Sequence, residues 1–273
     1  MKMLLTKVIL LVGLLGGGYW AYESGNVYEI GLPGDGQKPY VDVPVEAEKV
    51  EEVNEAEEPK EAVKADEEED LQRVPAQVNL AVPFASQAPY GVWDEVHEDT
   101  CEEAAILMVD RYYKGERGTL DAEGVEKELQ ALVAFENKTF GFFEDTTARE
   151  TAELVRLFYQ YPKVELIVEP TAEDIKAHVR AGRPVVLPTA GRILANPYFS
   201  GAGPKYHMIV VKGYTEDGFI VNDPGTKRGA DWLYDTDHLM RSIHDWEVPE
   251  GIENHPADIP KEKKVAIVIY DTE

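Results

Sequence analysis

A long segment near the amino end of the chain is too acidic, and too poor in large apolar residues, to form a hydrophobic core. Residues 46–70 are dense in glutamate and aspartate, and only Lys49, Lys60 and Lys64 oppose them. Such a segment cannot bury enough apolar surface to fold, and its like charges repel one another. We therefore predict a disordered acidic linker over residues 24–73, which leaves residues 74–273, about 200 residues, for one folded domain.

An apolar run precedes this linker, and its densest part extends from Val8 to Tyr22. Counted from Met3, the run reaches about the twenty residues that a helix needs to cross a bilayer. Lysines lie at its start and Glu23 follows it, which predicts that the amino end stays inside and the rest is exported. We predict that residues 1–23 are a transmembrane anchor with the folded domain outside the cytoplasm. A cleaved signal peptide, giving a secreted protein, is the alternative, but no clear Ala-x-Ala site is present.

The charge of the chain limits its partners. The net charge is −25, with 52 acidic against 27 basic residues, which argues against nucleic acid or an anionic membrane surface as the main partner. Its single cysteine excludes an intramolecular disulfide. No metal-ligand spacing joins this cysteine to His238, His244 or His255. We therefore expect no metal and no cofactor, and we expect the chain to act as a monomer on a peptide or protein substrate.

Helical patterns dominate the first half of the folded region and strand patterns the second half. Helices are predicted over residues 101–115, 121–135, 146–159 and 171–181. Strands are predicted over residues 78–84, 164–168, 184–187, 207–214, 219–222 and 265–270, and a loop over 196–205. The strand at 207–214 is apolar on both faces and should be central in its sheet. The order of elements predicts an α+β domain in which N-terminal helices pack on an antiparallel sheet.

The cysteine, Cys101, opens the first predicted helix. Asp99 and Thr100 stand just before it, and either residue can cap a helix. Backbone N–H groups and the helix dipole at this end favour an anion, which lowers the pKa of a thiol and activates it as a nucleophile. A single cysteine is nevertheless more often a small buried apolar residue, so the rest of the chain must supply a reason to assign it a reaction.

A predicted hairpin brings a histidine and an aspartate together. If residues 215–218 form the turn, His207 lies close to Asp223 across the ladder, and both share one face when the numbers of paired positions add to an even value. An aspartate in this place can orient an imidazole and stabilise its charged form. Taken singly, a core histidine and a turn aspartate are the favoured interpretations of these residues. His97 is a rival base, but its charged neighbours predict a solvated loop histidine.

A glutamine completes the set of candidate residues. Gln87 precedes Cys101 in a loop after the first predicted strand. Its side-chain amide can donate a hydrogen bond to the oxyanion of a tetrahedral intermediate, beside the backbone N–H of the cysteine. A solvated loop glutamine is the alternative interpretation.

These residues and their order resemble the C39-like peptidase family. The resemblance extends from Val82 to at least Trp246, and it is carried by the sequence Val82-Pro83-Phe84-Ala85-Ser86-Gln87-Ala88-Pro89, Trp93, Cys101, His207, Gly213-Tyr214 and Asn222-Asp223-Pro224. It implies a papain-like cysteine peptidase fold. It further implies that Cys101 is the nucleophile, His207 the general base and acid, Asp223 the orienting carboxylate and Gln87 the oxyanion donor.

The chain also departs from this family. Many relatives have Gly-Pro after the cysteine, whereas this chain has Glu102-Glu103. Negative charge there would raise the pKa of the thiol.

Together with the apolar run near the amino end, the resemblance predicts a membrane-tethered extracytoplasmic cysteine peptidase. Two alternatives stay open: a cell-wall peptidoglycan amidase or endopeptidase, and a surface binding module that keeps the fold without catalysis.

Overall fold

The computed structural model describes residues 13–15, 18–23, 26–29, 75–246 and 262–272. The chain divides into two units between Arg73 and Val74. The described residues of the first unit form an antiparallel sheet of β1 (Gly13–Leu15), β2 (Gly18–Glu23) and β3 (Asn26–Glu29).

The predicted membrane anchor and acidic linker fall mostly outside the described residues. Residues 1–12 and 30–73 belong to that part of the chain. Among the described residues, no helix is both long and apolar enough to cross a membrane. The anchor and the linker therefore stay predictions.

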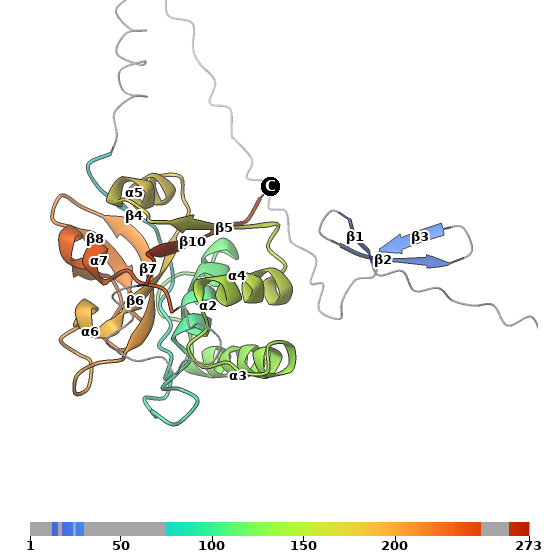
Figure 1. Cartoon of the computed structure of the whole chain (residues 1–273), viewed down its shortest axis with the longest axis horizontal. Coiled ribbons are helices and arrows are strands. Elements are labelled where there is room, and N and C mark those ends of the chain that lie inside the picture. Colours follow the sequence, from blue (N-terminus) through green and yellow to red (C-terminus); the bar gives the residue numbers. More distant parts are fainter. Residues whose placement is uncertain (1–12, 16–17, 24–25, 30–74, 247–261, 273) are drawn as a thin grey trace, which may run out of the picture. The chain divides into compact units, whose positions relative to one another are not determined.

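The second unit is built on one sheet of seven strands, all joined by antiparallel pairing (Figure 1). The strand order is β5-β10-β6-β7-β8-β9, and β4 also pairs with β7. The strands are β4 (Val78–Asn79), β5 (Lys163–Val168), β6 (Val185–Ala190), β7 (Tyr206–Tyr214), β8 (Phe219–Asn222), β9 (Trp232–Tyr234) and β10 (Val265–Tyr270). The antiparallel sheet and its helices confirm the predicted α+β class.

Helices cover both faces of this sheet (Figure 1). One face carries α2 (Cys101–Tyr113), α3 (Ala122–Thr139) and α4 (Ala148–Leu154), which continues into a π-helical turn, η1 (Val155–Tyr159). The other face carries α5 (Ala172–Arg180), α6 (Gly191–Leu194) and α7 (Thr236–Ser242). Met208 and Val210 of β7 pack with the first group, and Ile209 and Val211 pack with the second. This two-sided burial explains why residues 208–211 of β7 are all apolar.

Local sequence signals determine where several helices begin. Thr147 caps α4 and forms a capping box with Glu150. Thr171 caps α5 in the same way with Asp174, and Asp121 caps α3. Each box satisfies backbone N–H groups that the first helical turn leaves without partners.

A bulge in β7 sets the register that the site needs. Near the turn, Tyr214 pairs with Phe219 and Gly213 with Ile220, whereas beyond the bulge Val211 pairs with Val221. One extra residue, Lys212, lies between these two registers, and it forms an ion pair with Asp231. Because side chains alternate along a strand, removing the extra residue would turn every preceding side chain of β7 to the other face. The bulge therefore produces the register that the predicted hairpin requires.

Two buried glutamates join α2 to α3. Glu103 and Glu136 have no exposed surface. Burial and the charge of Glu136 raise the pKa of Glu103 well above its usual range, and burial raises the pKa of Glu136 to about 8. At neutral pH both carboxyl groups therefore keep their protons, and no basic side chain in the described residues pairs with them.

This pair predicts a stability that falls as the pH rises. A carboxyl group with a raised pKa in the folded state binds its proton there more tightly than in the unfolded chain. The free energy of unfolding should therefore decrease from about pH 4.5 to about pH 8. Glu136→Gln should flatten this decrease and raise the free energy of unfolding at pH 9 by about 2 kcal/mol or more.

Urea denaturation across this pH range measures the effect. Glu123→Gln makes the same charge change at an exposed position of α3 and should leave the pH dependence as it is. If the free energy of unfolding changed equally with pH in the native chain and in Glu136→Gln, the pair would not titrate between about pH 4.5 and about pH 8.

Candidate active site

Cys101 is the first residue of α2 and lies at the edge of the core. Its side chain is buried, with 5% of the residue exposed. Thr100 is the N-cap, but no side chain caps the helix, because the Thr100 hydroxyl donates instead to the backbone oxygen of Gln87 at 3.2 Å. The prediction that the side chain of Asp99 or Thr100 caps this helix is therefore wrong. The hydroxyl serves to fasten the start of α2 to the loop that carries Gln87.

The thiol of Cys101 faces a carboxyl group. Its sulfur donates to Oε2 of Glu102 at 3.0 Å. Burial raises the pKa of Cys101 well above its usual value, and an ionised Glu102 would raise it further through its charge and this hydrogen bond, whereas a hydrogen bond from the backbone N–H of Met208 lowers it. In this arrangement the thiol is neutral. The expectation that the helix terminus lowers the pKa is overturned, because burial and Glu102 outweigh the dipole.

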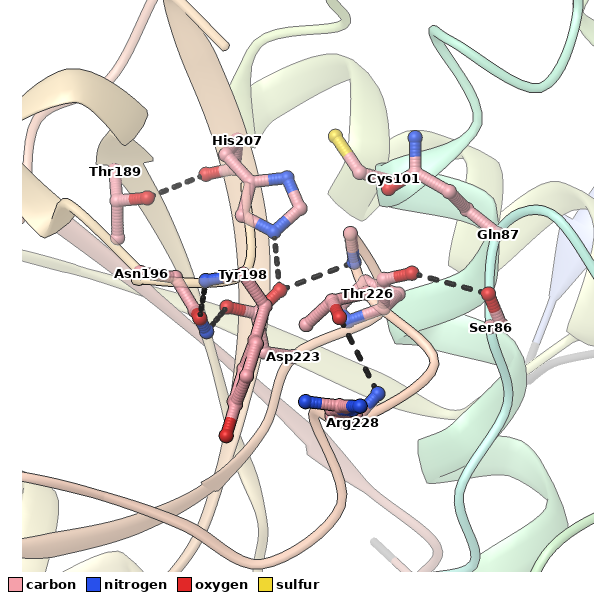
Figure 2. Close-up of polar contacts among 12 residues, drawn as sticks. Ser86, Gln87, Cys101, Thr189, Asn196, Tyr198, His207, Asp223, Thr226 and Arg228 are labelled. Carbon is pink, nitrogen blue, oxygen red and sulfur yellow. Dashed lines mark hydrogen bonds and ion pairs between the residues drawn. The ribbon is translucent and has the colours of Figure 1, made fainter. Parts of the chain in front are cut away.

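His207 and Asp223 form a buried pair at the end of the β7–β8 hairpin. Nε2 of His207 lies 2.7 Å from Oδ1 of Asp223, and both side chains are almost completely buried. The hairpin thus brings these residues together, as its register predicted. Since Nε2 is engaged, Nδ1 is the ring nitrogen left for a reaction, and among the described residues no hydrogen bond engages it. Figure 2 shows this nitrogen on the ring edge away from Asp223, toward the side where Cys101 lies.

Asp223 is held by donors that sequence reasoning missed. Its Oδ2 accepts hydrogen bonds from Nδ2 of Asn196 at 2.7 Å and from the hydroxyl of Tyr234 at 3.2 Å. Its Oδ1 also accepts from the backbone N–H of Gly225 at 3.0 Å. Asn196 lies in the predicted loop and Tyr234 in β9, which the sequence did not predict. No linear pattern links either residue to Asp223, because the link arises only from the fold.

The imidazole occupies a closely fitted space. The ring of Phe199 packs edge-on against it, with centroids 5.2 Å apart. A Cβ atom at Gly225 would lie 2.7 Å from Cε1 of His207, so only glycine leaves room for the ring in this position. The hydroxyl of Thr189 donates to the backbone oxygen of His207 at 2.8 Å. These contacts hold the imidazole in one orientation.

Gln87 lies beside the cysteine but points its amide elsewhere. Nε2 donates to the backbone oxygens of His97 at 2.9 Å and Glu98 at 3.2 Å. Its Oε1 is buried and has no hydrogen-bond partner among the described residues. The backbone of Gln87 donates to the oxygen of Pro224 at 3.1 Å, which links the cysteine segment to the Asp223 turn. The predicted oxyanion role of Gln87 therefore stays a prediction.

His97 is a structural residue, and the prediction that it is solvated is wrong. It is 7% exposed, and its two ring nitrogens lie 2.7 Å from Asp94 and 2.8 Å from Glu126 of α3. Burial alone would lower the pKa of His97, but these two carboxylates outweigh it and raise the pKa. Both nitrogens are occupied, so His97 is no rival to His207 as a base.

The site thus joins three distant segments of chain (Figure 2). The sulfur of Cys101 reaches the backbone of Met208, the residue after His207. Asn222, the residue before Asp223, donates from Nδ2 to the backbone oxygens of Val82 and Pro83. A thiol, an imidazole oriented by a carboxylate and an amide are the groups that nucleophilic catalysis by cysteine uses. No hydrogen bond joins the sulfur to His207, whose nearest partners are those described above.

A metal centre finds no support in the described parts of the chain. There, no group of three or more histidine, cysteine, aspartate or glutamate side chains is arranged to hold a metal ion.

Comparisons with known proteins identify relatives of the folded region. The model of the family described as "Peptidase_C39 like family" matches residues 79–249. A crystal structure of a protein assigned as a C39-like peptidase, from Bacillus anthracis, aligns with a TM-score of 0.45 and 17% sequence identity. That alignment covers 72% of this chain and 98% of the other. No curated protein matches the chain.

The donors to Asp223 predict a measurable cost when one of them is removed. Asn196→Ala leaves Oδ2 of a buried carboxylate with one donor fewer, which should lower the free energy of unfolding by about 1.5–3 kcal/mol. Asn196→Asp keeps the size but adds a second carboxylate, and it should cost more. Tyr234→Phe should act in the same direction as Asn196→Ala. Denaturant unfolding at neutral pH measures all three. If Asn196→Asp were the mildest change, Asp223 would not be an ionised acceptor.

Proposed function

Because the chain belongs to the Peptidase_C39 like family, we propose that it is a membrane-tethered extracytoplasmic cysteine peptidase that hydrolyses peptide or amide bonds. The observation that carries this proposal is the buried pair of His207 and Asp223, 2.7 Å apart, held beside the only cysteine of the chain. The membrane tether is proposed from the sequence of residues 1–73 alone.

The reaction begins with proton transfer from the cysteine to the histidine. Asp223 occupies Nε2, so Nδ1 of His207 is the base. The S–H bond turns from Oε2 of Glu102 toward Nδ1, the thiol gives up its proton, and the sulfur attacks the substrate carbonyl carbon. A C–S bond forms, and the imidazolium returns the proton to the leaving amine as the C–N bond breaks. Water then attacks the acyl-enzyme with His207 as base, which releases the acid and restores the thiol.

The developing oxyanion needs hydrogen-bond donors close to the sulfur. The backbone N–H of Cys101 lies in the first turn of α2, where N–H groups have no partner within the helix. Nε2 of Gln87 becomes a second donor if it leaves the oxygens of His97 and Glu98 when substrate binds. This change exchanges two hydrogen bonds within the loop for one to a charged oxygen, which is the stronger kind.

A binding module without catalysis is the second candidate function. The observation that favours it is the thiol itself, which is 5% exposed and bonded to Glu102, with a raised pKa. On this alternative the fold would be kept for recognition, and Cys101 would react no faster than a free thiol.

Site variants separate these functions by their effect on hydrolysis. Purified full-length chain is incubated with a peptide library and, separately, with purified peptidoglycan, which distinguishes a general peptidase from a cell-wall enzyme. Cys101→Ala and His207→Ala should each reduce the rate on the substrate so found by about 1,000-fold or more.

His178→Ala, in α5, is the matched histidine control and should keep the native rate. Cleavage that survives Cys101→Ala would rule out the cysteine mechanism. No cleavage of either material by the native chain would favour the binding module.

A further inference from the structure

The residue after the cysteine presents a buried carboxyl group to the reacting sulfur, and the proposed hydrolysis leaves it without a role. Glu102 is 1% exposed, and its Oε2 lies 3.0 Å from the sulfur of Cys101. Its other oxygen, Oε1, is buried and has no hydrogen-bond partner within the described residues. A buried carboxylate whose hydrogen bonds come only from a thiol and from its own backbone N–H would be poorly solvated, whereas a carboxylic acid suits the same place.

The groups around Glu102 are acidic or neutral. Glu103 follows Glu102 on α2, and Asp145 lies in the segment before α4. The phenol of Tyr206 on β7 is close enough that the charge of an ionised Glu102 would raise its pKa. In the described parts of the chain, no lysine, arginine or histidine forms an ion pair with Glu102. Burial and the charges of Glu103 and Asp145 raise the pKa of Glu102 well above its usual range. The carboxyl group is therefore protonated at neutral pH.

An ionised Glu102 would oppose the reaction. A carboxylate and a thiolate 3.0 Å apart in a buried site repel each other strongly, and one of them must keep its proton. A protonated carboxyl group in the same position has an O–H directed at the sulfur. The thiolate needs such a donor, because within the described residues its other hydrogen bond comes only from the backbone N–H of Met208.

We propose that Glu102 is a further catalytic residue, a neutral carboxylic acid whose Oε2–H donates a hydrogen bond to the Cys101 thiolate. This inference rests on the proposed function. In the step concerned, the thiol proton passes to Nδ1 of His207, and Glu102 keeps its own proton throughout. The thiolate then accepts hydrogen bonds from the backbone N–H of Met208 and from Glu102, and its charge is balanced by the imidazolium beside Asp223.

The reactivity of the thiol tests this role without any substrate. Cys101 is the only cysteine, so its alkylation by iodoacetamide can be followed by the mass of the full-length chain across a range of pH. Glu102→Gln keeps a neutral donor, and its alkylation rate at pH 7 should stay within about threefold of the native rate. Glu102→Met keeps the length without the donor. It should react about 10-fold more slowly or worse, with a higher apparent thiol pKa.

Glu103→Gln is the matched control, since it removes the same acid one position further along α2, where the carboxyl group faces Glu136. It should leave the alkylation profile native. Circular dichroism and thermal melting establish that each variant is folded, and Glu102→Leu repeats the test if Glu102→Met is not.

Three results would overturn the proposal. Faster alkylation in both Glu102→Gln and Glu102→Met would mean that Glu102 is an ionised group that suppresses the thiolate. Unchanged rates in both, or equal losses in both, would mean that donation by this side chain does not matter. The outcome is separate from that of the hydrolysis assay, because a chain that cleaves nothing can still show the donor dependence of its thiol.

Discussion

The contact between His207 and Asp223 is the interaction on which the rest of the site depends. The aspartate accepts hydrogen bonds from the imidazole, from the backbone of Gly225, and from the side chains of Asn196 and Tyr234. A carboxylate so satisfied can remain charged in the core, and it fixes which nitrogen of the imidazole is left to react. The bulge at Lys212 exists on this account to bring both residues to the same face of the hairpin.

The cysteine side of the site follows a different electrostatic rule. Hydrogen-bond donors surround the side chain of Asp223, whereas burial keeps the acids near Cys101 and along the α2–α3 contact protonated. Glu102, Glu103 and Glu136 are all buried, and burial is the main cause of the raised pKa of each. A chain of net charge −25 thus carries part of its acid inside the fold as neutral groups. Catalysis by a thiolate then depends on which group beside it holds a proton.

The sequence was sufficient to predict features that rest on local chemistry or on periodicity. The buried strand β7 and the approach of His207 to Asp223 both follow from spacing along the chain. The family resemblance was also confirmed.

Features that depend on tertiary partners were not predictable. The burial of His97 requires Glu126 of α3, the direction of the Gln87 amide requires the 97–98 backbone, and the role of Asn196 requires a loop to fold back on Asp223. In each case the partner lies far away in the sequence or belongs to the backbone, and no pattern of residue types marks it.

The most direct test of the central claim is covalent labelling of Cys101 by a peptide vinyl sulfone at neutral pH, compared between the native chain and His207→Ala. The probe reacts fastest where a thiolate and a peptide-binding site coincide, and the imidazole supplies the base that forms the thiolate. The native chain should be labelled rapidly, and His207→Ala should be labelled more slowly by at least about 100-fold. Equal labelling of the two chains, at the rate of a free thiol, would show that the histidine and aspartate pair does not serve the cysteine.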